Sequence, residues 1–178
     1  LQFNPARIIS AGANIDRKTI AEVPCFLCEQ NRPKEQMQKQ VDKNFTLLVN
    51  PFPIMPQHFT IPLRTHRPQS IGMNYGEIYR LLNAYPTLTV FYNGPKCGAS
   101  APDHMHFQAV CSGMLPLQTN WPRLSRDTEV LIKNDERGAI TAVRGFAVPV
   151  FSIRTTDQHT GEQLFRKLYS ALPMHGGD

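Results

Sequence analysis

The stretch NGPKCGASAPDHMHFQ, residues 93–108, decides how the rest of the chain is interpreted. His104, His106 and Gln108 occupy every second position at its end, and a period of two places three such side chains on one face of a β-strand. Two imidazoles and a carboxamide cost free energy to bury unless each finds a polar partner. The stretch therefore predicts either a site that uses these groups or a half-exposed strand that happens to carry two histidines.

The segments on either side of this strand predict a mixed fold. Within residues 74–85, Ile78, Leu81, Leu82 and Tyr85 recur at the spacing of an amphipathic helix. Similar patterns predict further helices at 16–23 and 160–172, a hairpin at 129–144, and strands at 43–50, 58–65, 88–94, 104–111 and 146–155. The expected fold class is α+β, a largely antiparallel sheet with one or two covering helices.

The composition favours a soluble protein that binds small anions. The 178 residues suffice for one well-buried core, or for one core with an extension. No apolar run reaches the roughly 18 residues that span a bilayer, and no signal-peptide pattern opens the chain, so we expect a cytoplasmic protein. The net charge is +5 and the pI is near 9.2. Because the basic residues are scattered along the chain, small phosphorylated ligands are favoured over nucleic acids.

The four cysteines fall into one pair and two single residues. Cys25 and Cys28 stand in PCFLCEQNRP, and C-x-x-C spacing is typical of either a redox dithiol or half of a metal site. The turn-forming residues that follow suit a zinc knuckle better than a thioredoxin-like helix. Cys97 and Cys111 have no partner at metal-ligand spacing, so we expect both to be small packed residues.

The order of the elements, together with the motif H-x-H-x-Q, resembles the histidine triad (HIT) superfamily of nucleotide-binding proteins. Gln108 in the third triad position is similar to the transferase branch, which includes galactose-1-phosphate uridylyltransferase, diadenosine tetraphosphate phosphorylase and GDP-hexose phosphorylase. GASAPDHMHFQ is similar to the phosphorylases, whereas CFLC looks like the uridylyltransferase. The resemblance covers roughly residues 24–111. It implies a nucleotidyltransferase or phosphorylase that acts on a sugar nucleotide or a dinucleoside polyphosphate.

The resemblance assigns catalytic roles to His106 and Gln108. His106 would be the nucleophile that forms a covalent nucleotidyl-histidine, and a neutral imidazole is competent for this attack. Its other ring nitrogen would donate to the backbone carbonyl of His104, which keeps the lone pair on the attacking nitrogen. The amide of Gln108 would donate to a phosphoryl oxygen. An amide cannot shuttle protons, and a phosphate leaving group needs little protonation, so transfer is expected rather than hydrolysis.

Two loops are expected to supply the remaining substrate contacts. The loop before the strand contains small residues that let the backbone approach a phosphate closely, with an ordinary turn as the alternative. The resemblance places the nucleoside near the NPF segment, although this could equally be a proline-rich turn with a core phenylalanine. The expected nucleotide and phosphate contacts are Asn50, Phe52, Asn93, Lys96, Gly98 and Ser100. His58, which opens the strand at 58–65, is expected to be structural.

The resemblance also implies a structural Zn²⁺ ion. Cys25, Cys28, His66 and His104 match the positions of a closed Cys2His2 site in the uridylyltransferase. Such an ion would tie the early knuckle to the strand that bears the nucleophile. The GDP-hexose branch lacks the metal, and in that case CFLC would be a packing or redox feature.

The implied organisation has two parts. Residues 1–112 would form a HIT-like nucleotide-binding region, and residues 113–178 would be an extension of the same domain or the start of a second HIT-like half. The implied partners are a nucleoside diphosphate-linked small molecule and a phosphate acceptor, with no nucleic acid or membrane, and a homodimer is a further expectation. The alternatives are a non-catalytic nucleotide-binding module, half of a larger two-part enzyme, and a HIT-type hydrolase, which Gln108 disfavours.

Overall fold

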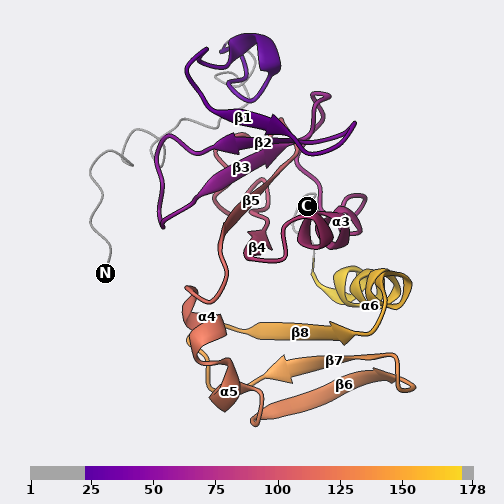
Figure 1. Cartoon of the computed structure of the whole chain (residues 1–178). Helices are drawn as coiled ribbons and strands as arrows, with labels where there is room; N and C mark the ends of the chain where they lie inside the picture. The colour runs from indigo at the N-terminus through magenta and orange to yellow at the C-terminus, as the bar shows by residue number, and fades with distance from the viewer. Residues whose placement is uncertain (1–22, 174–178) are drawn as a thin grey trace. The chain divides into compact units, whose positions relative to one another are not determined.

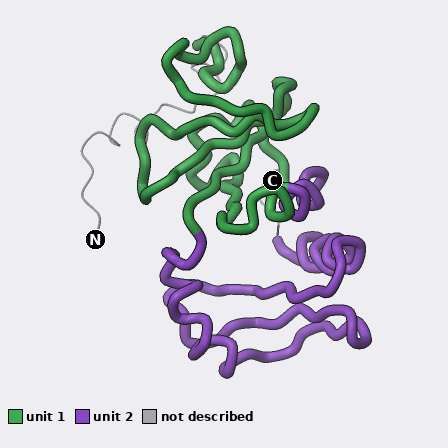
Figure 2. Tube along the Cα trace, viewed as in Figure 1, with its two compact units in different colours: residues 1–71, 81–111, 178 green, residues 72–80, 112–177 purple. Residues whose placement is uncertain are grey.

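The computed structural model describes residues 23–173. All but the last residue of the helix expected at 16–23 lies outside the described residues. The remainder confirms the α+β class, with antiparallel sheets and a few helices (Figure 1). The described residues divide into two compact units, of which the first holds 23–71 and 81–111 and the second holds 72–80 and 112–173 (Figure 2).

The first unit is built on a five-stranded antiparallel sheet with the order β1-β2-β3-β5-β4. The strands expected from the sequence are present with shorter bounds, and β1 was not predicted. A short 3-10 helix, Glu29–Asn31, follows the C-x-x-C pair. The strands are β1 (Gln38–Gln40), β2 (Thr46–Val49), β3 (Phe59–Pro62), β4 (Leu88–Phe91) and β5 (His106–Cys111).

Strand β5 lies inside this sheet, between β3 and β4, and its two faces differ in chemistry. Phe107 and Ala109 are fully buried on one face. There the centroid of the Phe107 ring lies 5.8 Å from the centroid of the Phe45 ring and 6.3 Å from that of the Tyr92 ring. His106 and Gln108 alternate with them and so point to the other face. The apolar face anchors the strand in the core and thereby fixes where the polar face points.

The second unit contains a three-stranded antiparallel meander, β6-β7-β8. Its strands are β6 (Thr128–Asn134), β7 (Gly138–Val143) and β8 (Val150–Thr155), which confirms the expected hairpin. Helix α6 (Gln158–Ala171) packs on this sheet. A Cβ on Gly138 would lie 2.8 Å from the Arg154 carbonyl oxygen and 2.9 Å from a Leu164 methyl carbon, so glycine permits this close packing.

Three further helices complete the described chain. They are α3 (Glu77–Ala84), which was expected, and the short α4 (Pro116–Thr119) and α5 (Trp121–Leu124), which were not. In α3 the predicted apolar stripe is only partly buried, because Leu81 is 2% exposed whereas Leu82 is 36% exposed. Within residues 23–173, no helix has the length and apolar character that crossing a membrane requires.

Candidate active site and metal cluster

The His106 side chain is a neutral imidazole, and one of its two ring nitrogens forms a hydrogen bond to the backbone. The strand begins at this residue, and its side chain is 3% exposed. Its Nδ1 lies 2.8 Å from the backbone carbonyl oxygen of His104, to which it donates. Burial lowers the pKa of His106 by more than this hydrogen bond raises it. The neutral tautomer therefore leaves the lone pair on Nε2, which is the arrangement a nucleophilic imidazole needs.

Gln69 fixes the backbone of His106, and the sequence reading missed it. Strand β4 ends at Phe91, opposite Gln108, so it does not extend to His106. Instead, the His106 backbone N–H donates to Gln69 Oε1 at 2.7 Å, and Gln69 Nε2 donates to the His106 carbonyl oxygen at 3.0 Å. The same Nε2 donates to the Asn93 carbonyl oxygen at 2.9 Å. The buried Gln69 carboxamide thus makes the hydrogen bonds to His106 that a longer β4 would have made. It also connects the loop at Asn93 to the candidate nucleophile.

Gln108 has a second histidine as its partner. His58 Nε2 lies 2.8 Å from the Gln108 carboxamide oxygen. His58 is 4% exposed, directly precedes β3, and its ring stacks on Phe91 at 6.2 Å between centroids. The expectation that His58 is structural missed this contact. The only signal in the sequence was a histidine at the start of a strand.

The expected nucleoside contacts lie in a turn that is already well bonded. Asn50 Nδ2 donates to Thr60 Oγ1 at 3.0 Å, and Asn50 Oδ1 accepts from the Phe52 backbone N–H at 2.8 Å. Thr60 pairs with Gln108 across β3 and β5, so this turn borders the polar face of β5. The Asn50 amide is therefore committed to the turn, and the Phe52 ring is half-buried. Their contact with a nucleoside stays a prediction.

The small-residue loop adopts a tight backbone path. The backbone N–H groups of Cys97 and Ala99 both bond to the Gly94 carbonyl oxygen, at 2.9 and 3.4 Å. Gly98 has a φ of +90°, in the region that favours glycine. Lys96 is exposed and Ser100 is half-buried. The loop leads from Asn93 to β5, and its contact with a phosphate stays a prediction.

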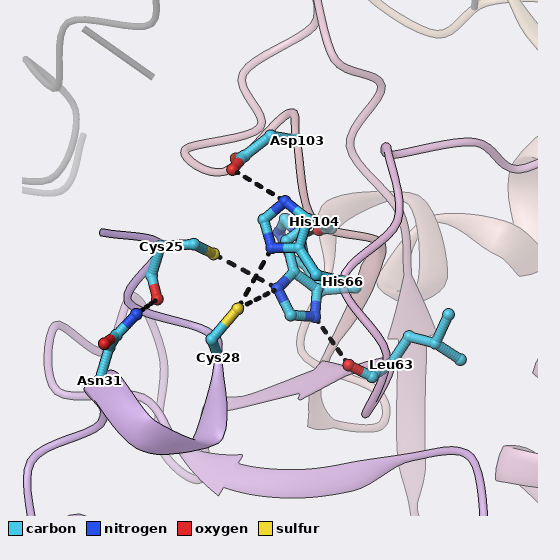
Figure 3. A network of polar contacts seen from close by, with 8 residues as sticks. Cys25, Cys28, Asn31, Leu63, His66, Asp103 and His104 are labelled. Atoms are coloured by element: carbon cyan, nitrogen blue, oxygen red, sulfur yellow. Dashed lines mark hydrogen bonds and ion pairs between the residues drawn. The ribbon is translucent and has the colours of Figure 1, made fainter. Parts of the chain in front are cut away.

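The four expected metal ligands converge in the first unit. Their ligand atoms, the sulfurs of Cys25 and Cys28 and one ring nitrogen each of His66 and His104, all lie within 4.8 Å of one another. Figure 3 shows the two thiols pointing at the two imidazoles. The closest pairs are Cys25 to His104 at 3.3 Å and Cys28 to His66 at 3.2 Å. This cluster could hold a metal ion.

Hydrogen bonds and burial place the two histidines of the cluster in a state that suits metal binding. His104 Nε2 donates to the Leu63 carbonyl oxygen at 2.7 Å, which leaves the lone pair on the nitrogen that faces the cysteines. His66 Nε2 lies 3.4 Å from a carboxylate oxygen of Asp103 (Figure 3). Burial lowers the pKa of His104, which favours the neutral ring that a metal requires. Burial also raises the pKa of the Cys25 thiol to about 11, and a bound cation would reverse this by favouring the thiolate.

His104 belongs to both centres. Its ring lies in the metal cluster, and its carbonyl oxygen accepts the hydrogen bond that His106 Nδ1 donates. His104 precedes β5, so of the three alternating residues only His106 and Gln108 lie within the strand. The backbone at residue 104 therefore links the cluster to the candidate nucleophile.

The two other cysteines lie in different surroundings. Cys97 is exposed in the small-residue loop, so the prediction that it is packed was wrong. Loops approaching a strand from solvent can place a small apolar residue outside the core, and the sequence carried no sign of this. Cys111 is half-buried, and its thiol donates to Gln57 Oε1 at 2.7 Å.

Comparison with known proteins gives a single family assignment. Neither the curated proteins nor the solved structures contain a significant match to the chain. Residues 1–111 match the model of a protein family described as a domain of unknown function, DUF4922. The match ends at the last residue of β5, so it includes both the metal cluster and the His106 site. Because the match spans more than half of the 178 residues, the chain belongs to the DUF4922 family.

Proposed function

We propose that this chain is a nucleotidyltransferase or phosphorylase acting on a nucleoside diphosphate-linked substrate, with His106 as the nucleophile. The observation that carries the proposal is the state of His106. Its ring is buried and neutral, Nδ1 is occupied by the His104 carbonyl, and Gln108 follows on the same strand face. A polar strand face with no chemical task does not need an imidazole prepared in this way.

The reaction takes two displacements. In the first, the Nε2 lone pair of His106 attacks the α-phosphorus, so that an N–P bond forms. The bond from phosphorus to the bridging oxygen breaks, and its electron pair leaves with the phosphate of the departing group. In the second, an oxygen of an acceptor phosphate attacks the same phosphorus, and the N–P electron pair returns to Nε2. In both steps the Gln108 amide would donate to a non-bridging oxygen where negative charge develops.

We also propose that the ion at the cluster is Zn²⁺ and that its role is structural. Two thiolates and two neutral imidazoles in a closed set are typical of structural zinc sites. The ion would supply a rigid cross-link between the knuckle at residues 25–28 and the segment that enters β5. The four ligands leave no open position, so the substrate is expected to bind at the polar face of β5.

Intact-protein mass spectrometry tests the proposal directly. The full chain is mixed with UDP-glucose, GDP-glucose or diadenosine tetraphosphate in the absence of an acceptor. We expect the mass of one nucleotidyl group to appear on His106 with at least one donor, as an acid-labile, alkali-stable adduct that added inorganic phosphate or sugar phosphate discharges. His106→Ala should abolish the adduct, whereas His159→Ala, which removes an exposed histidine of α6, should leave it unchanged.

The same experiment separates the alternatives. Nucleotide binding without an adduct would favour a non-catalytic module and contradict the proposal. An adduct on a residue other than His106 would contradict the mechanism. An adduct that water discharges as fast as phosphate does would favour a hydrolase.

A further inference from the structure

We infer that His58 is a positioning residue that fixes the direction of the Gln108 carboxamide and so directs the nucleotidyl group to phosphate instead of water. The inference rests on the proposed function, because it concerns the group that would contact the phosphoryl oxygens. It assigns His58 a task beyond packing at the start of β3.

The protonation of His58 follows from its first partner. The backbone N–H of Ile54 lies 3.3 Å from His58 Nδ1. A backbone amide can only donate, so Nδ1 must carry the lone pair. The ring is then neutral, and its single proton resides on Nε2. The turn that contains Ile54 thereby selects the tautomer of His58.

The direction of the Gln108 amide follows from that tautomer. His58 Nε2 is a donor and lies 2.8 Å from one end of the carboxamide, so that end must be the oxygen. The opposite orientation would place two N–H donors against each other. The Gln108 NH2 group is therefore the end that remains, and within residues 23–173 no acceptor takes a hydrogen bond from it. It is available to donate to a phosphoryl oxygen.

The surroundings of His58 hold its ring in place. The side chain is 4% exposed, and its ring stacks on Phe91 with an interplanar angle of 19°. Its own carbonyl oxygen accepts from the Asn50 backbone N–H at 3.0 Å, which fixes the backbone at the entry to β3. Phe91 in turn pairs with Gln108 across β4 and β5. The donor, the acceptor and the stacking ring are thus fixed by three adjacent strands.

This arrangement favours phosphate over water as the acceptor of the nucleotidyl group. A phosphate acceptor arrives as an anion and attacks without losing a proton, so it needs only donors around the phosphorus. Water must be oriented by an acceptor and must lose a proton as the P–O bond forms and the N–P bond breaks. With Gln108 Oε1 turned toward His58, the other end of the carboxamide is its NH2 group, which cannot accept a hydrogen bond from a water molecule. If the amide turned over, its oxygen would repel the phosphoryl oxygens and accept a hydrogen bond from water.

Two variants of nearly equal length and volume test this role. His58→Met removes both ring nitrogens, and His58→Gln keeps a side-chain N–H donor that can reach the same oxygen. Each protein is labelled with the donor that modifies the wild-type chain and is then chased with inorganic phosphate. The readout is the ratio of nucleoside diphosphate to nucleoside monophosphate, which is independent of how much protein folds.

We expect His58→Met to raise the share discharged by water by roughly tenfold, which is less than the loss of a whole oxyanion donor would produce. His58→Gln should stay close to the wild-type ratio. An unchanged ratio in His58→Met would overturn the inference, as would an equal change in the two variants.

A spectroscopic measurement keeps the inference testable without turnover. In the wild-type chain with 15N-labelled histidine, the ring shifts of His58 should show a protonated Nε2 and a bare Nδ1. The side-chain NH2 signals of Gln108 should change in His58→Met and much less in His58→Gln. A protonated Nδ1, or unchanged Gln108 signals, would overturn the inference. Absence of any adduct on the wild-type chain, combined with the expected spectra, would instead overturn the proposed function alone.

Discussion

The two units use similar elements but differ in how their strands are joined. In the second unit, β6, β7 and β8 pair in chain order as a meander. In the first, β3 pairs with β5, and β5 also pairs with β4, so partners far apart in the sequence meet. This non-sequential pairing brings His58 within 2.8 Å of Gln108, and the segment before β1 brings Cys25 within 3.3 Å of His104. Long-range pairing gathers side chains of different chemistry, whereas a meander gathers mainly its own neighbours.

Removing the proposed Zn²⁺ should produce the largest difference in stability between the first unit and the second. A closed structural zinc site contributes on the order of 10 kcal/mol to folding. We expect about one zinc per chain in protein purified without added metal, by elemental analysis. A strong chelator should then lower the melting temperature sharply. Amide exchange should rise around residues 25–28 and 63–66, while β6 to β8 keep their protection at temperatures below the transition.

A variant without the two cysteine ligands is the control for the chelator. Cys25→Ser combined with Cys28→Ser should contain no zinc, and its melting temperature should not respond to the chelator. A wild-type chain without metal and with unchanged stability in chelator would reduce the cluster to a packing or redox feature.

The next largest effect should come from Gln108. Losing one preorganised donor to a developing oxyanion slows turnover by roughly a hundredfold to a thousandfold. Gln108→Ala should therefore slow nucleotidyl transfer by about this factor, with a modest change in nucleotide affinity measured by calorimetry. Gln163→Ala, which removes an exposed glutamine of α6 in the second unit, is the matched control. Unaffected turnover in Gln108→Ala would show that the amide does not contact the transition state.

The same contrast explains how much could be predicted from the sequence. The hairpin, the strand after it and α6 follow from local patterns, because apolar alternation, a turn and a helical apolar face are all contained in short windows. The metal cluster was also predicted, but only because a resemblance supplied the partners of the C-x-x-C pair. The short α4 and α5 were missed because four residues hold too little periodicity to be recognised.

The resemblance predicted the bond from His106 Nδ1 to the His104 carbonyl oxygen, but the contacts of Gln69 and His58 could not be predicted. Gln69 lies in an irregular segment with no motif, and its task depends on β4 ending before it reaches His106. The contact of His58 with Gln108 depends on the register of β3 against β5, in which Thr60 is paired with Gln108. Local sequence propensity does not determine where β4 ends or in which register β3 pairs with β5. Residues that position a site through long-range contacts are therefore found only in the structure.

The smallest predicted effect concerns the acid response of the second unit. Asp157 caps α6, and its carboxylate accepts hydrogen bonds from the Thr160 backbone N–H and from the Thr160 hydroxyl, both at 2.8 Å. The bond from the backbone N–H is the main reason that the pKa of Asp157 lies below its ordinary value of 3.8. A carboxyl group with a lower pKa in the folded state stabilises that state when ionised. Its contribution is complete above the ordinary pKa and is lost as the pH falls through the lowered one.

Amide exchange of α6, measured from pH 5 down to pH 2, checks this prediction. We expect the protection of the first turn of α6 to fall only below the ordinary pKa of Asp157, and the fall to be small because the carboxylate is exposed to solvent. Asp157→Ser keeps a capping oxygen without a titrating group, so its first turn should remain protected at pH 5 and show no acid-dependent loss. Asp157→Ala should have low protection across the whole range. An equal acid loss in Asp157→Ser and the wild-type chain would show that other groups control the acid response of this helix.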